Sequence, residues 1–279
     1  MRLSTVRVAD DQTAAARLEG EELVLLPFSD VGALLAAGDD WPERAVAAGG
    51  KRVPLAEASL APLVPHPNKI ICLGLNYATH IKEMGRPTPA HPTLFAKYDG
   101  SLIGAHDDIH MPPVSNDLDW EAELAVVIGR AGRHIPREKA LKHVAGYTVA
   151  NDVTVRDWQH RTREFLSGKT FEATTPVGPA LVTADEVPPG ASGLTISCSV
   201  DGHTMQKSNT ADLLFDVADT IAYVSTIITL LPGDLILTGT PGGVGAGRDP
   251  KVFLRPGQEL VTTVEGLGEL RNTVTKDQL

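Results

Sequence analysis

The sequence WEAELAVVI, at residues 120–128, has the two-residue alternation of a β-strand. Successive side chains of an extended chain point to opposite faces, so Glu121 and Glu123 project to one side while Ala122 and Leu124 project to the other. The β-branched residues that follow favour a strand over a helix. We therefore expect a strand that carries two carboxylates side by side. A solvated strand face is the alternative interpretation of this Glu-x-Glu pair.

A third acidic residue, Asp152, lies in the segment GYTVANDVTV at residues 146–155. Its apolar neighbours make a solvated face a weaker explanation for this acid. If Glu121, Glu123 and Asp152 come together, they need a counter-charge, which a divalent cation would supply. Ligands that are all oxygen favour Mg²⁺, Mn²⁺ or Ca²⁺ over zinc or copper. Three protein ligands would leave about three octahedral positions for water and substrate, as in a catalytic metal site.

Strand-like runs separated by Gly and Pro continue on both sides of this segment. They include KIICLGL, HVAGYTVAN, GPALVT, LTISCSV, DLILTG and QELVTTVEG. Asp201-Gly202 stands between two strand-like runs and predicts a type I′ hairpin. Helical periodicity is clear only over Thr210–Leu230 and in VRDWQHRTREF at residues 155–165. Since strands and helices do not alternate regularly, we predict a β-rich α+β fold and not a doubly wound parallel sheet.

The proline-spaced segment PLVPHPNK, at residues 62–69, indicates a domain boundary. The residues before it read as short alternating runs with one helical patch, VGALLAAG. We predict a small N-terminal α+β domain at residues 1–65 and a catalytic domain at residues 66–279. Nothing in the N-terminal part argues for a functional site, and dimerisation or stability are the roles that we consider for it.

His80 and Glu83 stand three residues apart in NYATHIKEMG, a spacing that places both on one face of a helical turn. A carboxylate beside an imidazole raises its basicity and orients it, which makes a pair able to deprotonate water. The sequence Gly85-Arg86-Pro87 that follows suits a loop able to close over a ligand. A surface contact between the two side chains is the alternative.

Two further segments carry candidate binding groups. Lys169 lies in SGKTF; it is either a surface residue or, if buried near a metal, a group that stabilises an oxyanion. The loop TGTPGGVG, at residues 238–245, could approach a ligand closely. It is no P-loop, because no Gly-Lys-Ser/Thr follows, and the chain has no strand–GxGxxG–helix unit for a dinucleotide.

Composition limits the class of function. The chain has 279 residues, 42% of them hydrophobic, and a formal net charge of -10, which disfavours nucleic acid and anionic membranes as partners. An anionic substrate would need a metal ion or a few well-placed cations to overcome that field.

Two cysteines, both in apolar runs, leave little for a disulfide framework, and the N-terminal residues lack the apolar core of a signal peptide. We therefore expect a cytoplasmic protein without a transmembrane helix.

Taken together, the segments resemble the fumarylacetoacetate hydrolase family. The matching motifs occur in the family's order over about residues 69–270: GLNYATHIKEMG, PTLFAKYDGSLIG, DWEAELAVVIGR, GYTVANDVTVRDWQ, GKTFEATTPVGP and PGDLILTGTPGGVG. Each motif is weak by itself, whereas six in order form a specific signal. The resemblance implies a mixed β-roll, a homodimer and a divalent metal, usually Mg²⁺ or Mn²⁺.

The resemblance also implies roles for particular residues. Those that match the family's functional positions are Glu121, Glu123 and Asp152 as metal ligands, His80 and Glu83 as a water-activating pair, Lys169 as a catalytic lysine, and Lys97, Arg156, Gln159 and Thr240 as substrate-binding groups. Two positions depart from the family pattern: Tyr98 replaces a proline after Lys97, and Glu172 replaces an aspartate. Neither is an expected metal ligand. Both loops should border the pocket, so the substrate specificity of a particular family member does not carry over to this protein.

These parts suit the hydrolysis of a carbon–carbon bond in an acylpyruvate of the fumarylpyruvate or acetylpyruvate type. The carboxylate and adjacent keto oxygen would chelate the metal, His80 and Glu83 would activate water, and Lys169 would stabilise the oxyanion. Decarboxylation of oxaloacetate, or isomerisation of a 2-hydroxyhepta-2,4-diene-1,7-dioate type of substrate, would use the same chelate and is the alternative. A binding protein without turnover is a third hypothesis, which the presence of His80, Glu83 and Lys169 disfavours.

Overall fold

Two β-sheets form the body of the protein. The computed structural model describes residues 1–9, 12–83 and 87–277, with the side chains of His80 and Glu83 excepted. Within these residues, the larger sheet has 11 strands and the smaller sheet has five. A pair of two-residue strands, β9 (Leu118–Asp119) and β12 (Thr154–Val155), lies apart from both sheets. The β-rich α+β fold that the sequence predicts is confirmed, and the described strands form no closed barrel.

The larger sheet is mixed and mostly antiparallel. In spatial order its strands are β4 (Arg52–Pro54), β3 (Glu22–Leu25), β2 (Gln12–Glu19), β1 (Arg2–Ala9), β13 (Thr175–Thr183), β11 (Val144–Asn151), β10 (Ala122–Ile128), β16 (Leu235–Leu237), β5 (Ile70–Gly74) and β6 (Thr93–Lys97), with β7 (Leu102–Ile103) beside β13. Only β16–β5 and β13–β7 are parallel among its described pairings. A regular βαβ arrangement is therefore absent from the described sheet, as the sequence predicts.

The smaller sheet packs across the larger one. Its strands, in spatial order, are β15 (His203–Asn209), β14 (Thr195–Val200), β17 (Glu259–Val264), β18 (Gly268–Lys276) and β8 (Ile109–Met111). The turn between β14 and β15 is the predicted Asp-Gly hairpin, in which Asp201 has φ 49° and Gly202 has φ 76°. Both residues take the left-handed region that a type I′ turn requires.

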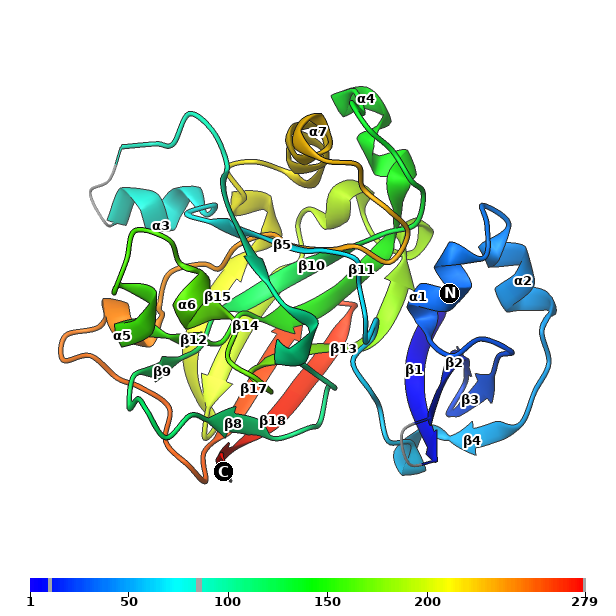
Figure 1. The fold of residues 1–279 in the computed structure, drawn as a ribbon, viewed down its shortest axis with the longest axis horizontal. Helices are drawn as coiled ribbons and strands as arrows, with labels where there is room; N and C mark the ends of the chain where they lie inside the picture. The colour runs from blue at the N-terminus through cyan, green and yellow to red at the C-terminus, as the bar shows by residue number, and fades with distance from the viewer. Residues whose placement is uncertain (10–11, 84–86, 278–279) are drawn as a thin grey trace.

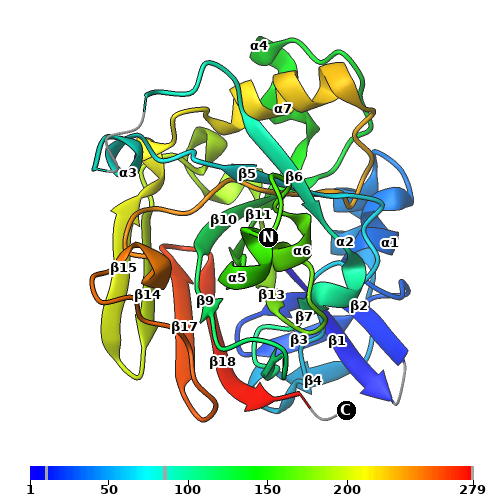
Figure 2. The ribbon, with the colours of Figure 1, turned by 60° about the vertical axis from the view of Figure 1, so that its left-hand side comes forward.

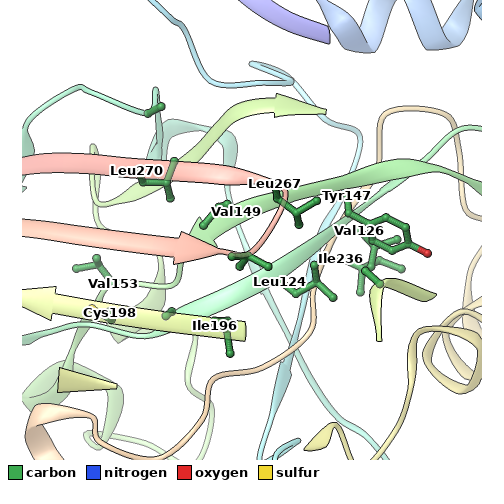
Figure 3. Packing of buried hydrophobic residues seen from close by; sticks show 14 of the residues in the cluster. Leu124, Val126, Tyr147, Val149, Val153, Ile196, Cys198, Ile236, Leu267 and Leu270 are labelled. Atoms are coloured by element: carbon green, nitrogen blue, oxygen red, sulfur yellow. The ribbon is translucent and has the colours of Figure 1, made fainter. Parts of the chain in front are cut away.

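The central core lies between the two sheets. Figure 3 shows Leu124 and Val126 of β10, Tyr147 and Val149 of β11, and Ile196 of β14 as members of one cluster of buried side chains. Burial of such side chains is the main favourable term in folding, at about 25 cal/mol per Å² of apolar surface. Strand β10 is buried on both faces, because its alternate residues belong to a second apolar cluster on the far side of the sheet.

The N-terminal residues cover one edge of the molecule. Strands β1 to β4 continue the larger sheet through the pairing of β1 with β13, and they lie at the right of Figure 1 with helices α1 and α2. The second apolar cluster joins these helices to the underside of β10 and β16. The domain boundary that we predict between residues 65 and 66 lies in the connection from β4 to β5.

The helices are short. They are α1 (Val31–Ala36), α2 (Trp41–Ala47), α3 (Ala78–Glu83), α4 (Arg137–Ala140), α5 (Arg156–Gln159), α6 (Leu166–Lys169) and α7 (Val217–Ile227). In the part of the chain that the structure describes, no helix is long and apolar enough to cross a membrane. Figure 1 shows α7 and α4 together above the larger sheet, and Figure 2 shows α5 and α6 on another side, where α6 contacts β6 and β12.

The helix expected over Thr210–Leu230 is shorter than predicted. Asp216 caps α7 by accepting a hydrogen bond from the Asp219 amide, so the helix begins at Val217. The residues before it form only a short 3-10 helix, Thr210–Asp212, followed by a bend. At this bend the Asn76 side chain exchanges two hydrogen bonds with the Phe215 backbone and holds it out of the helix. A tertiary contact has overridden the helical periodicity there. The prediction of one helix over residues 155–165 is also wrong, since only Arg156–Gln159 is helical there.

Candidate metal centre and substrate cavity

Three carboxylates meet where β10 and β11 pair. Glu121 directly precedes β10, Glu123 lies within it, and Asp152 directly follows β11. The antiparallel register places Ala122 opposite Asn151, and the Asp152 amide donates to the Glu121 carbonyl at 2.9 Å. One oxygen from each carboxylate lies within 4.8 Å of the others. All three residues are buried, so a solvated strand face does not explain the Glu-x-Glu pair.

The triad fits a divalent cation. Glu123 is fully buried, and its Oε2 accepts a hydrogen bond from the Gly239 amide at 2.7 Å. Its Oε1 is also buried and has no hydrogen-bond partner among the described residues. Burial raises the pKa of Glu123 well above its usual value, and the nearby charges of Asp152 and Glu121 raise it further. An unpartnered oxygen in such a cluster of hard ligands suits Mg²⁺ or Mn²⁺.

Two buried lysines compensate part of the negative charge. Lys169 Nζ donates to Glu121 Oε2 and to Asp152 Oδ2, both at 2.7 Å, and Lys97 Nζ donates to Asp152 Oδ1 at 2.6 Å. Burial by itself would raise the pKa of Asp152, but the charges of Lys169 and Lys97 outweigh it and lower the pKa. Burial by itself would lower the pKa of Lys169, but the negative charges of Asp152 and Glu121 outweigh burial, so the pKa of Lys169 is raised. Both groups are therefore held in their charged forms.

Close helix packing brings Lys169 into the site. The short helices α5 and α6 touch at Gly168, where an added Cβ would lie 2.4 Å from the backbone nitrogen of Gln159. Only glycine allows this approach, which places the next residue, Lys169, over the carboxylates. The interpretation of Lys169 as a surface residue is therefore wrong, since it is 2% exposed.

A cavity of about 420 Å³ opens beside the triad. Its polar wall comprises Glu121, Arg156, Gln159, His160, Lys169 and Thr240, and residues of the loop 243–247 also line it. Leu73, Phe95, Phe165 and Val244 form the apolar part of the wall. This mixture of convergent polar groups and apolar lining is typical of a small-molecule site.

Arg156 is anchored on three sides. Its Nε donates to Asp119 Oδ2 at 2.8 Å, and its Nη1 contacts Glu121 Oε1 at 2.7 Å and Gln159 Oε1 at 2.9 Å. Its Nη2 is buried and has no partner among the described residues. Burial would lower the pKa of Arg156, but Glu121 and Asp119 raise it above the usual value. Arg156 thus offers a fixed cationic donor at the cavity wall.

Only some of the remaining predicted site residues line the cavity. Gln159 and Thr240 line the cavity beside Arg156. Lys97 does not line this cavity; it lies behind Asp152, buried, and also contacts the Val153 carbonyl at 3.4 Å. His80 and Glu83 belong to helix α3, but their side chains lie outside the described residues, as do Gly85 and Arg86 of the following loop.

Asp119 is a site residue that the sequence analysis missed. It is fully buried, and its two oxygens accept four hydrogen bonds, from Arg156 Nε and from the amides of Trp120, Gly245 and Ala246, at 2.7–2.9 Å. This carboxylate therefore ties the guanidinium to the loop that forms the opposite cavity wall. A signal was present, because residues 119, 121 and 123 are all acidic and alternate along the chain.

Asp119→Asn should weaken anion binding without weakening metal binding. The amide nitrogen would face N–H donors of Arg156 or of the loop and could not accept from them, so the variant side chain would lose its hydrogen bonds to one of these two partners. In Mn²⁺-loaded protein, we expect the Kd for oxalate, measured by calorimetry, to rise by roughly tenfold, since hydrogen bonds that involve charged groups are the strong ones. Asp157→Asn, which changes an exposed acid one residue from Arg156, is the control and should leave both Kd values unchanged. An equal loss of Mn²⁺ affinity in Asp119→Asn would contradict the assigned role.

Comparisons with known proteins show which family and which structures this chain resembles. The family model described as fumarylacetoacetate (FAA) hydrolase C-terminal matches residues 69–275. A human protein named oxaloacetate tautomerase FAHD2A, mitochondrial, is 46% identical over 233 residues, which cover 83% of this chain and 74% of that protein. The structure of a putative HpcE protein from Mycobacterium smegmatis matches with a TM-score of 0.89 and 35% identity, over 100% of both chains. A maleylpyruvate hydrolase from a Sphingobium species, in complex with manganese(II) and pyruvate, matches with a TM-score of 0.81 and 29% identity, over 100% of both chains.

Proposed function

Because the chain belongs to the fumarylacetoacetate hydrolase family, we propose that it is a divalent-metal-dependent enzyme that acts on a small 2-oxo acid. The observation that supports this proposal best is the buried triad with an unpartnered Glu123 oxygen beside a cavity lined by cationic donors. The homologue that holds manganese and pyruvate supports the same combination of metal and ligand class. We propose Mg²⁺ or Mn²⁺ as the cofactor.

The charge balance of the site suits an anionic substrate. Within the described residues, the buried ionisable groups at the site are Asp119, Glu121, Glu123, Asp152, Lys97, Lys169 and Arg156. When all are ionised, the acids exceed the cations by one charge, and a divalent ion reverses the sign. The site would then attract a small carboxylate even though the chain as a whole carries a net charge of -10.

The chain's own residues divide the chemistry between them. A divalent ion held by Glu121, Glu123 and Asp152 would supply Lewis-acid stabilisation of negative charge on the substrate oxygens. Arg156 and Thr240 bind and orient the carboxylate from the cavity wall. Lys169 stabilises the negative charge that develops on oxygen when the substrate enolises or is attacked.

Hydrolysis of an acylpyruvate is the first reaction that we propose. It needs an activated water, and the His-x-x-Glu spacing on α3 supplies the residue types for that task. Glu83 would orient His80, and His80 would take a proton from water that attacks the distal carbonyl. Lys169 would stabilise the resulting oxyanion before the carbon–carbon bond breaks.

Keto–enol isomerisation or decarboxylation of a 2-oxo diacid such as oxaloacetate is the second candidate. The relative named as an oxaloacetate tautomerase, at 46% identity, favours it. Decarboxylation releases CO2 and leaves an enolate, and isomerisation moves a proton from carbon to oxygen. Neither reaction needs attack by water, so neither needs the α3 pair to activate one.

A substrate panel with the Glu83→Gln variant separates the two reactions. Fumarylpyruvate, acetylpyruvate and oxaloacetate are assayed with and without Mg²⁺ or Mn²⁺. If water activation is the role of the α3 pair, Glu83→Gln lowers hydrolysis by about 10²-fold or more and leaves decarboxylation unchanged. Glu138→Gln, on exposed α4, is the control. Equal loss of all activities would argue against water activation, and no metal-dependent turnover of any substrate would overturn the proposed function.

Assembly and location stay predictions. We propose a homodimer, as the sequence resemblance implies, and a cytoplasmic location, although the human relative is named as mitochondrial.

A further inference from the structure

We propose that Gln206 is a positioning residue that commits the Thr240 hydroxyl to act as a hydrogen-bond donor toward the anion in the cavity. This inference rests on the proposed function, because it concerns how the same cavity binds a carboxylate. It assigns a role to a residue of the smaller sheet that lies outside every motif considered in the sequence.

Gln206 reaches from one sheet into the other. It lies on β15, is 1% exposed, and uses both hydrogens and the oxygen of its side-chain amide in hydrogen bonds. Its Oε1 accepts from the Ala122 amide at 2.9 Å, and its Nε2 donates to the Pro241 carbonyl at 2.9 Å and to Thr240 Oγ1 at 2.8 Å.

The chemistry of these partners determines the orientation of the amide. The Ala122 N–H can only donate, so the atom facing it must be the oxygen of Gln206. The Pro241 carbonyl can only accept, so the atom facing it must be the nitrogen. The usual ambiguity between the two ends of a glutamine amide does not arise here.

It follows that Thr240 accepts a hydrogen bond from Gln206. A hydroxyl has one proton, and the proton of Thr240 takes no part in its hydrogen bond with Gln206. Among the hydrogen bonds of the described residues, the Thr240 hydroxyl only accepts. Since Thr240 lines the cavity with Arg156 and Lys169, its proton is available to a ligand there. The cavity thus presents a neutral donor next to two cationic ones, which is a preorganised arrangement for a carboxylate.

A purely structural role for Gln206 makes a different prediction. Its contact with the Ala122 amide lies between the two glutamates of the triad. If Gln206 served only to hold β10 in place, its replacement would disturb the metal site and reduce Mn²⁺ affinity. If it orients Thr240, replacement weakens anion binding and leaves Mn²⁺ affinity unchanged.

Gln206→Glu tests this difference. The introduced carboxylate keeps an oxygen for the Ala122 amide, but its second oxygen has no hydrogen for Thr240 or for the Pro241 carbonyl. The Thr240 hydroxyl then donates to that oxygen and turns its proton away from the cavity. In Mn²⁺-loaded protein we expect the Kd for oxalate, measured by calorimetry, to rise by roughly tenfold or more, while the Kd for Mn²⁺ changes by less than about twofold. Gln12→Glu, the same change at an exposed position on β2, is the control.

Two further measurements distinguish orientation from general damage. Thr240→Val should weaken oxalate binding to a similar extent, and adding Gln206→Glu to it should cause no further loss, because both changes remove one interaction. Lowering the pH should restore oxalate binding to Gln206→Glu relative to wild type, since a protonated carboxyl regains a donor for Thr240. If Gln206→Glu does not fold, Gln206→Met, which lacks any donor, should show the same non-additivity with Thr240→Val.

The outcomes separate this inference from the proposed function. If wild-type protein with Mn²⁺ does not bind oxalate, the proposed function fails. If wild type binds oxalate and Gln206→Glu binds it equally well, or if the losses from Gln206→Glu and Thr240→Val add, the role of Gln206 is overturned. Loss of Mn²⁺ affinity in Gln206→Glu would show a structural role instead.

Discussion

Replacing Glu123 with glutamine is expected to abolish Mn²⁺ binding and to lower kcat/KM for the accepted 2-oxo acid by at least about 10³-fold, because the Lewis-acid contribution is lost. Glu123 supplies the one triad oxygen that is buried without any partner in the described structure. A neutral amide at this position offers no charge to a cation and places N–H donors in a site built from acceptors. Calorimetric titration with Mn²⁺ and steady-state kinetics measure the two effects.

The metal-free protein gives an independent check on Glu123. Burial, with Asp152 and Glu121 nearby, raises the pKa of Glu123 in the folded state. A group of this kind contributes stability below its unfolded-state pKa, and that contribution is lost as the pH rises through the folded-state pKa. As the pH rises above 4.5, the ordinary pKa of a glutamate, the Tm of metal-free wild type should therefore fall relative to that of Glu123→Gln. Added Mn²⁺ should raise the Tm of wild type and of the control Glu138→Gln, but not that of Glu123→Gln. Undiminished Mn²⁺ binding by Glu123→Gln would overturn the metal site.

Lys169→Met should separate catalysis from metal binding. The Lys169 ammonium contacts Glu121 and Asp152, so in the proposed site it competes with the cation for their negative charge. Its removal should leave Mn²⁺ bound at least as tightly as in wild type. The kcat should nevertheless fall by about 10²–10³-fold, which is the usual effect of removing one donor to a developing oxyanion.

The stability of Lys169→Met should depend on the metal. Removing one partner of a buried ion pair costs about 3–5 kcal/mol, because the remaining charges are left buried and unpaired. Thermal or denaturant unfolding should show this loss in the metal-free variant, and saturating Mn²⁺ should recover most of it. Lys142→Met, at an exposed position, is the control and should change neither stability nor kcat. A variant with wild-type kcat would rule out oxyanion stabilisation by Lys169.

The site could be predicted from the sequence where its residues follow strand periodicity. Glu121 and Glu123 lie on one face of a strand because side chains alternate, and an apolar context around Asp152 indicated burial. The same local regularity predicts the Asp-Gly hairpin, whose two left-handed residues depend only on their own backbone preferences. Local patterns are sufficient for these features because the interactions that cause them are local.

Local patterns were insufficient where distant segments decide the outcome. The helix expected from Thr210 begins only at Val217, because Asn76, more than a hundred residues away, hydrogen-bonds the Phe215 backbone and holds it in a bend outside the helix. Lys97 matches a substrate-binding position by motif, yet the fold places it behind Asp152 and away from the cavity. Gln206 carries no sequence signal, because its partners belong to other strands and loops.

The sequence by itself determined the chemical inventory of this protein: three acids for a hard cation, basic residues for an anion, and a β-rich chain to carry them. The tertiary structure alone decided which of these groups meet, how deeply they are buried and which hydrogen-bond donors remain available to a ligand. The reason is physical. Residue type sets what a side chain can donate, accept or ionise, whereas the orientation of a guanidinium, an amide or a hydroxyl depends on partners that only folding brings within hydrogen-bond distance.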